Sequence, residues 1–429
     1  MLKIYDKNDI NKLYDILKNR KDNSLNEVTK TVVEIVDDVK INGDKAVKAY
    51  IKKFDGIDIE PEDFFMSESE IDEVYSKCDK DIVRIMEKAV ENLEEYHKKQ
   101  TQNAFILTKE GIVMGQRVLP IERVGLYVPG GSASYPSTAL MNAVPARIAG
   151  VKDIIILTPQ KKEGINPKII AAAKICGVKK IIKIGGAHGI AAAAYGTDSI
   201  AKVDKIVGPG NVYVTAAKKL VYGVVDIDMI AGPSEILVIA DKTADAKYIA
   251  ADLMSQAEHD AMASSILVTD SVELIENVNR EIARQMAYLS RKEIIAKSLG
   301  DYGAAVLCDS IADATAIANN IAPEHLELAV DNPFDMLDSI KNAGAVFMGH
   351  YTPEPVGDYF AGSNHVLPTN GTARFSSPLG VDSFVKKSSF VYYSKDKLQE
   401  QSGNIAKFAE SEQLTAHANA IKVRFEDEQ

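Results

Sequence analysis

The chain has 429 residues, a formal net charge of −11 and 46% hydrophobic residues. One hydrophobic core rarely grows beyond about 250–300 residues, so this length predicts two or three core-forming units. The acidic balance and the lack of a basic tract disfavour nucleic acid as a partner. No apolar run approaches the ~18 residues of a membrane span, and the first residues lack the apolar core of a signal peptide.

Three scattered cysteines, Cys78, Cys176 and Cys308, form no CxxC pair. This usage argues against a disulfide framework and for a reducing compartment, so we expect a cytoplasmic location. Cys176 ends an Ala-rich helical stretch and Cys308 ends an apolar strand. We interpret both as inert core thiols, because buried free cysteine behaves as a small hydrophobic residue.

The N-terminal 100 residues have apolar positions at helical spacing, and a hairpin is expected at 105–108 and 112–118. Two series of apolar strands and helices follow. The first has strands at 123–128, 153–158, 180–184, 205–207 and 235–240, with helices near 137–149, 167–175, 188–195 and 211–221. The second has strands at 235–240, 264–269, 304–307 and 345–348, with helices near 244–258, 271–288, 291–298, 310–320 and 334–342.

Continuous apolar strands between helices are typical of parallel sheets covered on both faces. The pattern therefore predicts an α/β fold: two tandem doubly wound, incomplete Rossmann-like parallel-sheet domains with a helical N-terminal region and a small C-terminal helical tail. Residues 352–380 are rich in Gly, Pro, Ser and Asn, which favours a functional loop. The helical segment 394–424 has too few apolar residues for a core of its own, so it must dock, and a second copy of the chain is one candidate surface.

Glycines cluster after three predicted strands, at 129–131, 185–186 and 208–210. Such turns can hold a pyrophosphate at a helix N-terminus. The dinucleotide fingerprint GxGxxG is absent. Ordinary tight-turn chemistry therefore explains the glycines equally well.

Four of the seven histidines lie beside a carboxylate or amide in the C-terminal half of the chain. Gln256 and His259 continue the buried face of the predicted helix 244–258, where polar groups need partners. Alone, the pair is better explained as a hydrogen-bonded core glutamine and a capping histidine, because isolated spacing motifs often arise by chance. Together with Asp358 and His417, it makes a ligand set that fits zinc, with manganese or cobalt as substitutes.

Glu324 and His325 are adjacent in a segment expected to be extended, so they should face opposite ways and serve different steps. A histidine titrating near neutrality suits proton abstraction from an alcohol or a hydrate. Glu412 and His417 are five residues apart, which is a rotation of ~140° on a regular helix. If both enter one site, the chain must bend between them; otherwise they are solvent-exposed helix residues.

These motifs together resemble histidinol dehydrogenase almost from end to end. The resemblance is carried by GLYVPGG at 125–131, VGPGN at 207–211, AGPSE at 231–235, Gln256 with His259, APEHL at 322–326, GDY at 357–359, NHVLPT at 364–369 and EQLTAH at 412–417. It implies oxidation of L-histidinol to L-histidine through L-histidinaldehyde, with two hydride transfers to NAD, as the final step of histidine biosynthesis.

The resemblance also implies roles for single residues. His325 would be the base for the alcohol proton and for the hydrate, and Glu324 would activate water. One Zn²⁺ per subunit would be bound by Gln256, His259, Asp358 and His417, the last from the partner subunit of an intertwined homodimer. Substrate contacts would come from Ser234, Gln256, His259, His325, Asp358, Glu412 and His417, and NAD contacts from Tyr127, His188 and Asn211. His188 stands where the family usually has Gln.

On this resemblance we expect residues 25–126 with 237–379 to form one α/β domain, residues 127–236 to form the domain with the NAD contacts, and residues 1–24 and 380–429 to be tail segments exchanged with a partner. No cysteine lies in a site motif, so a water-based second step is the consistent route. Alternatives are a related zinc- and NAD-dependent dehydrogenase of another small alcohol, a zinc hydrolase, and a catalytically silent assembly protein. The complete ligand set with Glu324, His325 and Glu412 favours histidinol, and the βα series with its Gly-rich turns disfavours a hydrolase.

Overall fold

The computed structural model describes residues 1–130 and 135–428. These residues form two compact units, one made of residues 1–100 and 121–384 and the other of residues 101–120 and 385–429. The first unit contains two parallel sheets, and the second contains one antiparallel sheet. No helix in the described part of the chain is both long and apolar enough to cross a membrane.

The first parallel sheet has the strand order β6-β5-β4-β7-β8. The chain leaves β4 on one side toward β5 and later returns to its other side with β7, so a topological switch point lies beside β4. Ligands of open α/β sheets bind at such points, outside the carboxyl ends of the strands. The strands are β4 (Arg123–Tyr127), β5 (Asp153–Leu157), β6 (Lys180–Ile182), β7 (Lys205–Val207) and β8 (Asp226–Ile227).

Helices cover both faces of this sheet, which explains its almost uniformly buried strands. One face packs against α2 (Glu68–Ser76), α3 (Lys80–Lys98), α4 (Pro136–Ala149) and α5 (Pro167–Ile175). The other face packs against α1 (Ile10–Phe54), α6 (Gly186–Tyr195) and α7 (Val212–Val221).

The second parallel sheet has the order β1-β11-β10-β9-β12-β13, with its switch point between β9 and β12. Its strands are β1 (Lys3–Tyr5), β9 (Glu235–Ala240), β10 (Ser264–Thr269), β11 (Gly303–Leu307), β12 (His325–Ala329) and β13 (Ala345–Met348). Its helices are α8 (Ala246–Ala257), α9 (Val272–Met286), α10 (Lys292–Tyr302), α11 (Ile311–Ile321), α12 (Phe334–Leu337) and α13 (Glu354–Tyr359).

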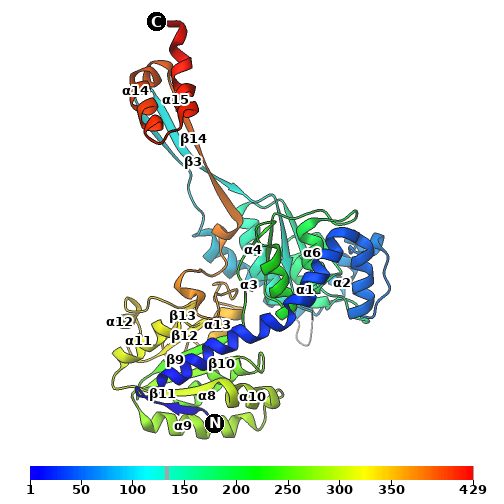
Figure 1. Ribbon diagram of the computed structural model, residues 1–429. Helices are drawn as coiled ribbons and strands as arrows, with labels where there is room; N and C mark the ends of the chain where they lie inside the picture. Colours follow the sequence, from blue (N-terminus) through cyan, green and yellow to red (C-terminus); the bar gives the residue numbers. More distant parts are fainter. Residues whose placement is uncertain (131–134, 429) are drawn as a thin grey trace. The chain divides into compact units, whose positions relative to one another are not determined.

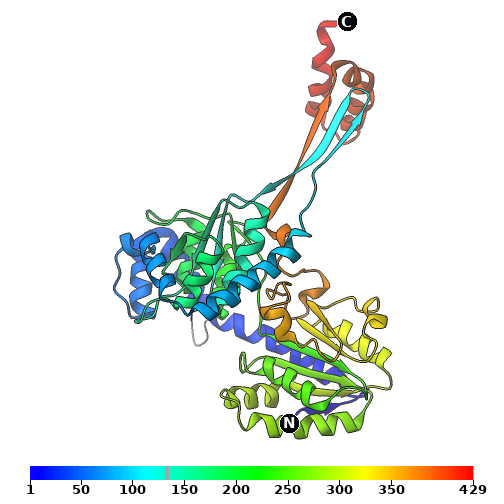
Figure 2. The same cartoon turned by 180° about the vertical axis from the view of Figure 1, so that it is seen from behind.

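Helix α1 joins the two sheets of the first unit. Its beginning packs in the core of the second sheet through Leu13, and its later turns pack against α6 and α7 through Val32 and Val47. Figures 1 and 2 show this long blue helix passing from one sheet to the other. Gly43, at φ +53°, breaks the helical backbone once along the way.

The second unit is a three-stranded antiparallel sheet with two helices. The strand order is β14-β3-β2, with β2 (Phe105–Lys109), β3 (Ile112–Pro120) and β14 (Val385–Tyr393), followed by α14 (Lys395–Ser411) and α15 (Thr415–Lys422). Glu412 caps α14, and Gln413 at φ +62° turns the chain before α15. The expected bend between Glu412 and His417 is therefore present.

Short 3₁₀ turns complete the described chain: η1 (Pro61–Asp63), η2 (Thr372–Arg374), η3 (Val381–Phe384) and η4 (Val423–Glu428). The predicted α/β class and nearly all predicted strands and helices are confirmed. Gly131 of the first predicted glycine turn lies outside the described residues.

Several local predictions were wrong. Strands β1, β8, β12 and β14 were not predicted. β12 carries buried His and Glu, and β14 has six exposed residues of nine. The predicted helix 334–342 ends at Leu337, and the predicted loop 352–380 begins with α13.

The predicted domain limits also differ from the sheets. β4 pairs with β5 and β7, so residues 123–126 belong with the strands that follow them. Within the predicted tail 1–24, β1 pairs with β11, and α1 continues without a break across residue 24. The exchange of residues 380–429 with a partner stays a prediction.

Candidate active site

A cavity of about 1760 Å³ lies between the two parallel sheets. The first sheet contributes the turns after β4, β6 and β7, and the second contributes residues near the beginnings of β9 and β12 together with α8 and α13. Of the residues proposed from the sequence, nine line this cavity: Tyr127, His188, Asn211, Ser234, Gln256, His259, Glu324, His325 and Asp358.

Gln256 and His259 enter the cavity from the C-terminal end of α8. Gln256 is completely buried, and neither atom of its side-chain amide has a hydrogen-bond partner. The hydrogen-bonded core glutamine considered from the sequence is therefore excluded. An amide that is buried without a partner costs about 1–3 kcal/mol of stability. Burial lowers the pKa of His259, and its ring stacks on Tyr135 at 6.3 Å between centroids. Both side chains are available to a ligand.

Helix α13 adds two carboxyl groups, Glu354 and Asp358, which are one helical turn apart. Their oxygens and a ring nitrogen of His259 lie within 4.8 Å of one another, so the three side chains could hold a metal ion. Sequence reasoning found Asp358 but missed Glu354, because the segment was expected to be a loop. The spacing of four residues was the available signal, since it puts both side chains on one helix face.

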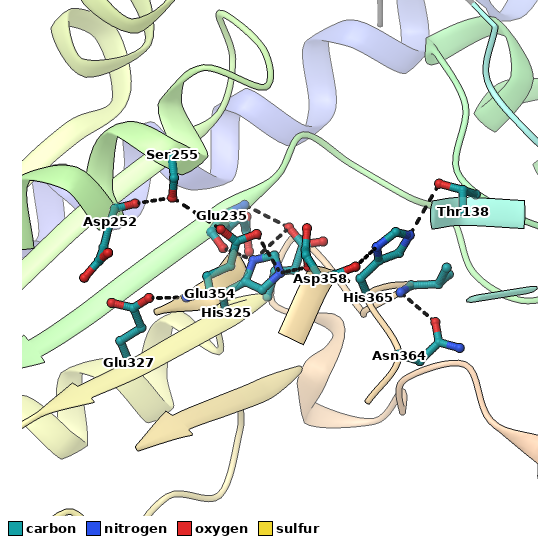
Figure 3. A network of polar contacts seen from close by, with 12 residues as sticks. Thr138, Glu235, Asp252, Ser255, His325, Glu327, Glu354, Asp358, Asn364 and His365 are labelled. Carbon is teal, nitrogen blue, oxygen red and sulfur yellow. Dashed lines mark hydrogen bonds and ion pairs between the residues drawn. The ribbon is translucent and has the colours of Figure 1, made fainter. Parts of the chain in front are cut away.

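His325 is held in a defined tautomer at the beginning of β12. Its Nδ1–H donates to the backbone oxygen of Glu235 at 2.9 Å, while its Nε2 is buried without a hydrogen-bond partner. Nε2 lies 3.9 Å from an oxygen of Glu354 and 3.8 Å from an oxygen of Asp358. Figure 3 shows this imidazole between the carboxyl groups. A neutral ring in this tautomer presents a lone pair to the cavity.

Glu324 does not point away from His325, as extended-strand alternation predicted. It precedes β12, and its Oε2 accepts the backbone N–H of Glu235 at 2.9 Å. The same oxygen lies 3.7 Å from Nδ1 of His325. The backbone of Glu235 therefore binds both side chains, the carboxylate through its N–H and the imidazole through its C=O.

Burial is the main cause of the pKa shifts of the titratable side chains around His325. It raises the pKa of Glu324 well above its ordinary value, with Glu235 adding to the effect, and lowers the pKa of His325 to about 3. Burial also raises the pKa of Glu354 to about 9 and that of Asp358 to about 6. Closely spaced buried carboxyl groups are electrostatically suited to a cation.

His365 connects the two halves of the cavity. Its Nε2 lies 3.3 Å from the hydroxyl of Thr138 on α4, and its Nδ1 lies 3.2 Å from the backbone oxygen of Asp358. Burial lowers its pKa to about 4. His365 was noted in the sequence but not selected as a site residue, and the structure places it in the cavity wall.

The first sheet lines the cavity with turns and rings. The hydroxyl of Tyr127, at the end of β4, accepts the backbone N–H of Gly186 at 3.1 Å. Asn211 caps α7 by accepting the N–H groups of Tyr213 and Val214, each at 3.1 Å. These contacts hold the glycine turns against the ends of β4 and α7.

His188 is buried in α6 with neither ring nitrogen hydrogen-bonded. Its ring lies 5.9 Å from those of Tyr50 and Phe54, and burial lowers its pKa to about 4. The ring is therefore neutral near pH 7, with an unused donor and an unused acceptor.

The remaining two predicted residues, Glu412 and His417, belong to the second compact unit. Both are exposed there. The predicted four-ligand set is thus divided: Gln256, His259 and Asp358 share the cavity of the first unit, and His417 is presented by the second.

Comparisons with known proteins agree with one another. A model of the histidinol dehydrogenase family matches residues 18–425. The histidinol dehydrogenase of Clostridium acetobutylicum is 57% identical over 416 residues, and that of Caldanaerobacter subterraneus is 54% identical over 413 residues, each covering 96% of both chains. The crystal structure of histidinol dehydrogenase from Elizabethkingia anophelis superposes with a TM-score of 0.92 at 39% identity, covering 99% of this chain and 98% of that one. The chain belongs to the histidinol dehydrogenase family.

Proposed function

We propose that this chain oxidises L-histidinol to L-histidine through L-histidinaldehyde, using two NAD and one zinc ion per subunit. The observation that carries the proposal is a base and a carboxyl group, His325 and Glu324, both held by the backbone of Glu235 beside a metal-ligand cluster in the cavity. The relatives from Clostridium acetobutylicum and Caldanaerobacter subterraneus, at 57% and 54% identity and both named histidinol dehydrogenase, support the same substrate.

In the first oxidation, His325 takes the proton of the substrate alcohol. The hydrogen bond from Nδ1–H to Glu235 leaves Nε2 as the accepting atom. Burial lowers the pKa of His325 to about 3, well below the near-neutral value expected from the sequence, so the ring is neutral at pH 7 and its Nε2 has a free lone pair. When bound, NAD would supply the acceptor for the carbon-bound hydrogen, which would leave as hydride and give the aldehyde.

In the second oxidation, Glu324 activates the water that attacks the aldehyde. Its raised pKa makes its carboxylate a stronger base than an exposed glutamate, and the N–H of Glu235 holds one oxygen in place. His325 then accepts the hydroxyl proton of the hydrate as the second hydride leaves. The described residues that line the cavity include no cysteine, which supports water over a thiol as the nucleophile.

Gln256, His259 and Asp358 would hold the zinc together with His417. The donor set fits, because amide and carboxylate oxygens and imidazole nitrogens are zinc ligands, and the amide of Gln256 is buried without a partner. When bound, the zinc would hold the amino and imidazole nitrogens of the substrate and so orient it. Glu354 lies close enough to the same position to act as a further ligand or to balance its charge.

NAD would bind along the first sheet. Tyr127, His188 and Asn211 would contact it, and the turns after β6 and β7 would receive its phosphates, since helix N-termini favour anions. NAD supplies the hydride acceptor. His188 can still donate one hydrogen bond to the cofactor, as the glutamine usual in the family would.

We also propose that two copies of the chain complete each site, with His417 as the fourth ligand and Glu412 as a substrate contact from the partner subunit. The second unit has few buried apolar side chains of its own. Its exposed apolar residues, which need cover, include Phe105, Ile106, Leu107, Val391, Tyr392, Phe408 and Leu414. A cytoplasmic location is part of the proposal and accords with three free cysteines.

The test is an assay with purified protein, histidinol and NAD, following the absorbance of reduced nicotinamide. We expect turnover that a chelator abolishes and added zinc restores. No reduced nicotinamide with histidinol under any metal condition would overturn the proposal. Hydrolysis of an added ester or amide without NAD would support the zinc hydrolase considered above.

The shared site has its own test. Chains carrying His417→Ala are mixed with chains carrying His259→Ala, each inactive alone. If His417 is donated across subunits, heterodimers regain part of the activity, because one of their two sites has all its ligands. Proven heterodimers without activity would contradict the exchange.

A further inference from the structure

A buried ion pair lies beneath the turn that follows β7. Lys218 on α7 and Asp228 after β8 form a salt bridge with side chains only 2% and 1% exposed. Replacing a buried pair of this kind with apolar residues is often neutral for stability, so its presence calls for another explanation. Neither residue belongs to the set proposed above for substrate, metal or NAD.

The pair binds both polar groups of Gly208. Nζ of Lys218 donates to the Gly208 oxygen at 2.9 Å, and Oδ2 of Asp228 accepts the Gly208 N–H at 2.7 Å. Oδ1 of Asp228 also accepts the N–H of Met229 at 2.6 Å. The orientation of the Gly208 backbone is therefore fixed by two charged side chains.

Gly208 itself is confined from the other side. Its φ is +109°, and a Cβ atom there would lie 2.2 Å from the backbone oxygen of Tyr127. Only glycine fits this close approach to β4. The turn is thus held between the end of β4 and the ion pair.

The residues after Gly208 present free backbone donors to the cavity. Pro209 has no N–H, and a Cβ at Gly210 would lie 2.4 Å from the side chain of Val214. Asn211 accepts N–H groups from the first turn of α7. Within the described chain, the N–H groups of Gly210, Asn211 and Val212 have no protein acceptor, and all three residues line the cavity. Such a helix N-terminus favours a phosphate.

We propose that Lys218 and Asp228 are a positioning pair for the cofactor: by fixing the Gly208 peptide, they hold the N–H groups of Gly210 and Asn211 where a dinucleotide phosphate binds. The inference rests on the proposed use of NAD. It assigns the pair to cofactor affinity, and not to the proton transfers or the metal.

Three variants separate positioning from stability. Lys218→Met and Asp228→Asn each leave one partner buried and unpaired, so both affinity for NAD and thermal stability should fall. The double variant Lys218→Met/Asp228→Leu removes both charges and should regain stability, yet the turn stays unsupported. Lys205→Met is the matched control, because Lys205 on β7 forms a 2.8 Å ion pair with Asp226 on the adjacent strand β8, and neither binds Gly208.

The dissociation constant for NAD is measured by displacement of the fluorescent reduced cofactor. The other measurements are KM for NAD and for histidinol, the zinc content per chain, and the melting temperature. For the double variant we expect near-normal melting and zinc content, an unchanged KM for histidinol, and NAD affinity lower by about 10- to 100-fold, as when a supporting shell is removed. Lys218→Arg should recover part of the affinity, and Lys205→Met should keep all of it.

A double variant with normal melting and normal NAD affinity would overturn the inference and leave the pair a structural one. If the double variant is unstable, the single variants decide: a Lys218→Met or Asp228→Asn variant that melts lower but binds NAD with wild-type affinity would overturn the inference. Wild-type protein that binds no NAD would overturn the proposed function, and this inference with it.

Discussion

The two parallel sheets of the first unit face the same cavity with opposite ends of their strands. From the first sheet come residues at the carboxyl ends of β4, β6 and β7, where the open α/β fold commonly binds ligands. From the second sheet come residues at the amino ends of β9 and β12, together with the C-terminal end of α8. Related topologies thus provide two chemically different walls.

The difference follows from the direction of the helices. The first wall presents the N-terminal ends of α6 and α7, whose free N–H groups favour anions such as phosphate. The second wall presents the C-terminal end of α8, which favours cations, beside buried carboxyl groups. Two sheets of related topology can therefore bind an anionic cofactor and a metal in one cavity, provided that one sheet faces the cavity with its carboxyl ends and the other with its amino ends.

The largest effect should come from His325 on the second wall. We expect His325→Asn to lower kcat for histidinol by about 10²- to 10⁴-fold, the usual contribution of a general base. Zinc content and NAD affinity should not change, since neither wall is displaced. His350→Asn is the control, because His350 lies outside the cavity. A parallel loss of NAD affinity in His325→Asn would show that the walls are not independent.

Glu354 tests the metal side of the same wall. Glu354→Gln should weaken zinc binding by about 10- to 100-fold, since it removes a carboxylate next to His259 and Asp358. Glu327→Gln is the matched control: this buried glutamate accepts the backbone N–H of Glu354 at 2.7 Å, and an amide oxygen can do the same. Zinc titrations against a competing chelator give both affinities. Equal zinc affinity in the wild type and Glu354→Gln would remove Glu354 from the site.

His188 on the first wall is tested through the pH dependence of protein stability. Its folded pKa is about 4, against about 6.5 for an unfolded histidine. Between these values the unfolded chain binds more protons, so this residue makes the protein less stable as pH falls from 6.5 toward 4.

Glutamine does not titrate, so His188→Gln should lose less stability than the wild type on going from pH 7 to pH 5. Urea unfolding at the two pH values measures the difference. An equal loss in both proteins would mean that His188 is not held neutral in the folded state.

The smallest effect is expected for the thiols, which belong to neither wall. Changing Cys78, Cys176 and Cys308 to alanine together should leave turnover with histidinol and with histidinaldehyde nearly unchanged, apart from some loss of stability at buried Cys176. Assays with each substrate separate the two oxidations. Loss of only the aldehyde step would contradict water as the nucleophile.

The contrast between the walls also explains what the sequence could predict. Strands such as β9 and β10 are buried along their whole length and therefore consist of apolar runs, which made them readable. The glycine turns of the first wall could also be predicted, because close backbone approach at Gly208 requires a residue without a side chain.

The second wall was harder to predict, because its functional residues interrupt the local patterns. Two polar residues, His325 and Glu327, are buried in β12 and hid the strand. Helix α13 lies in a Gly- and Pro-rich segment, so the pairing of Glu354 with Asp358 was missed. The ion pair of Lys218 and Asp228 joins residues whose contact depends on tertiary packing alone. Such conflicts between local pattern and fold are expected at functional sites.

The central claim is that one wall holds the metal and the other holds the cofactor. The most direct measurement is zinc content and NAD affinity determined side by side for wild type and His259→Ala. We predict that His259→Ala loses its zinc and binds NAD with the wild-type dissociation constant. A variant that keeps its zinc, or one whose NAD affinity falls together with its zinc, would contradict this division.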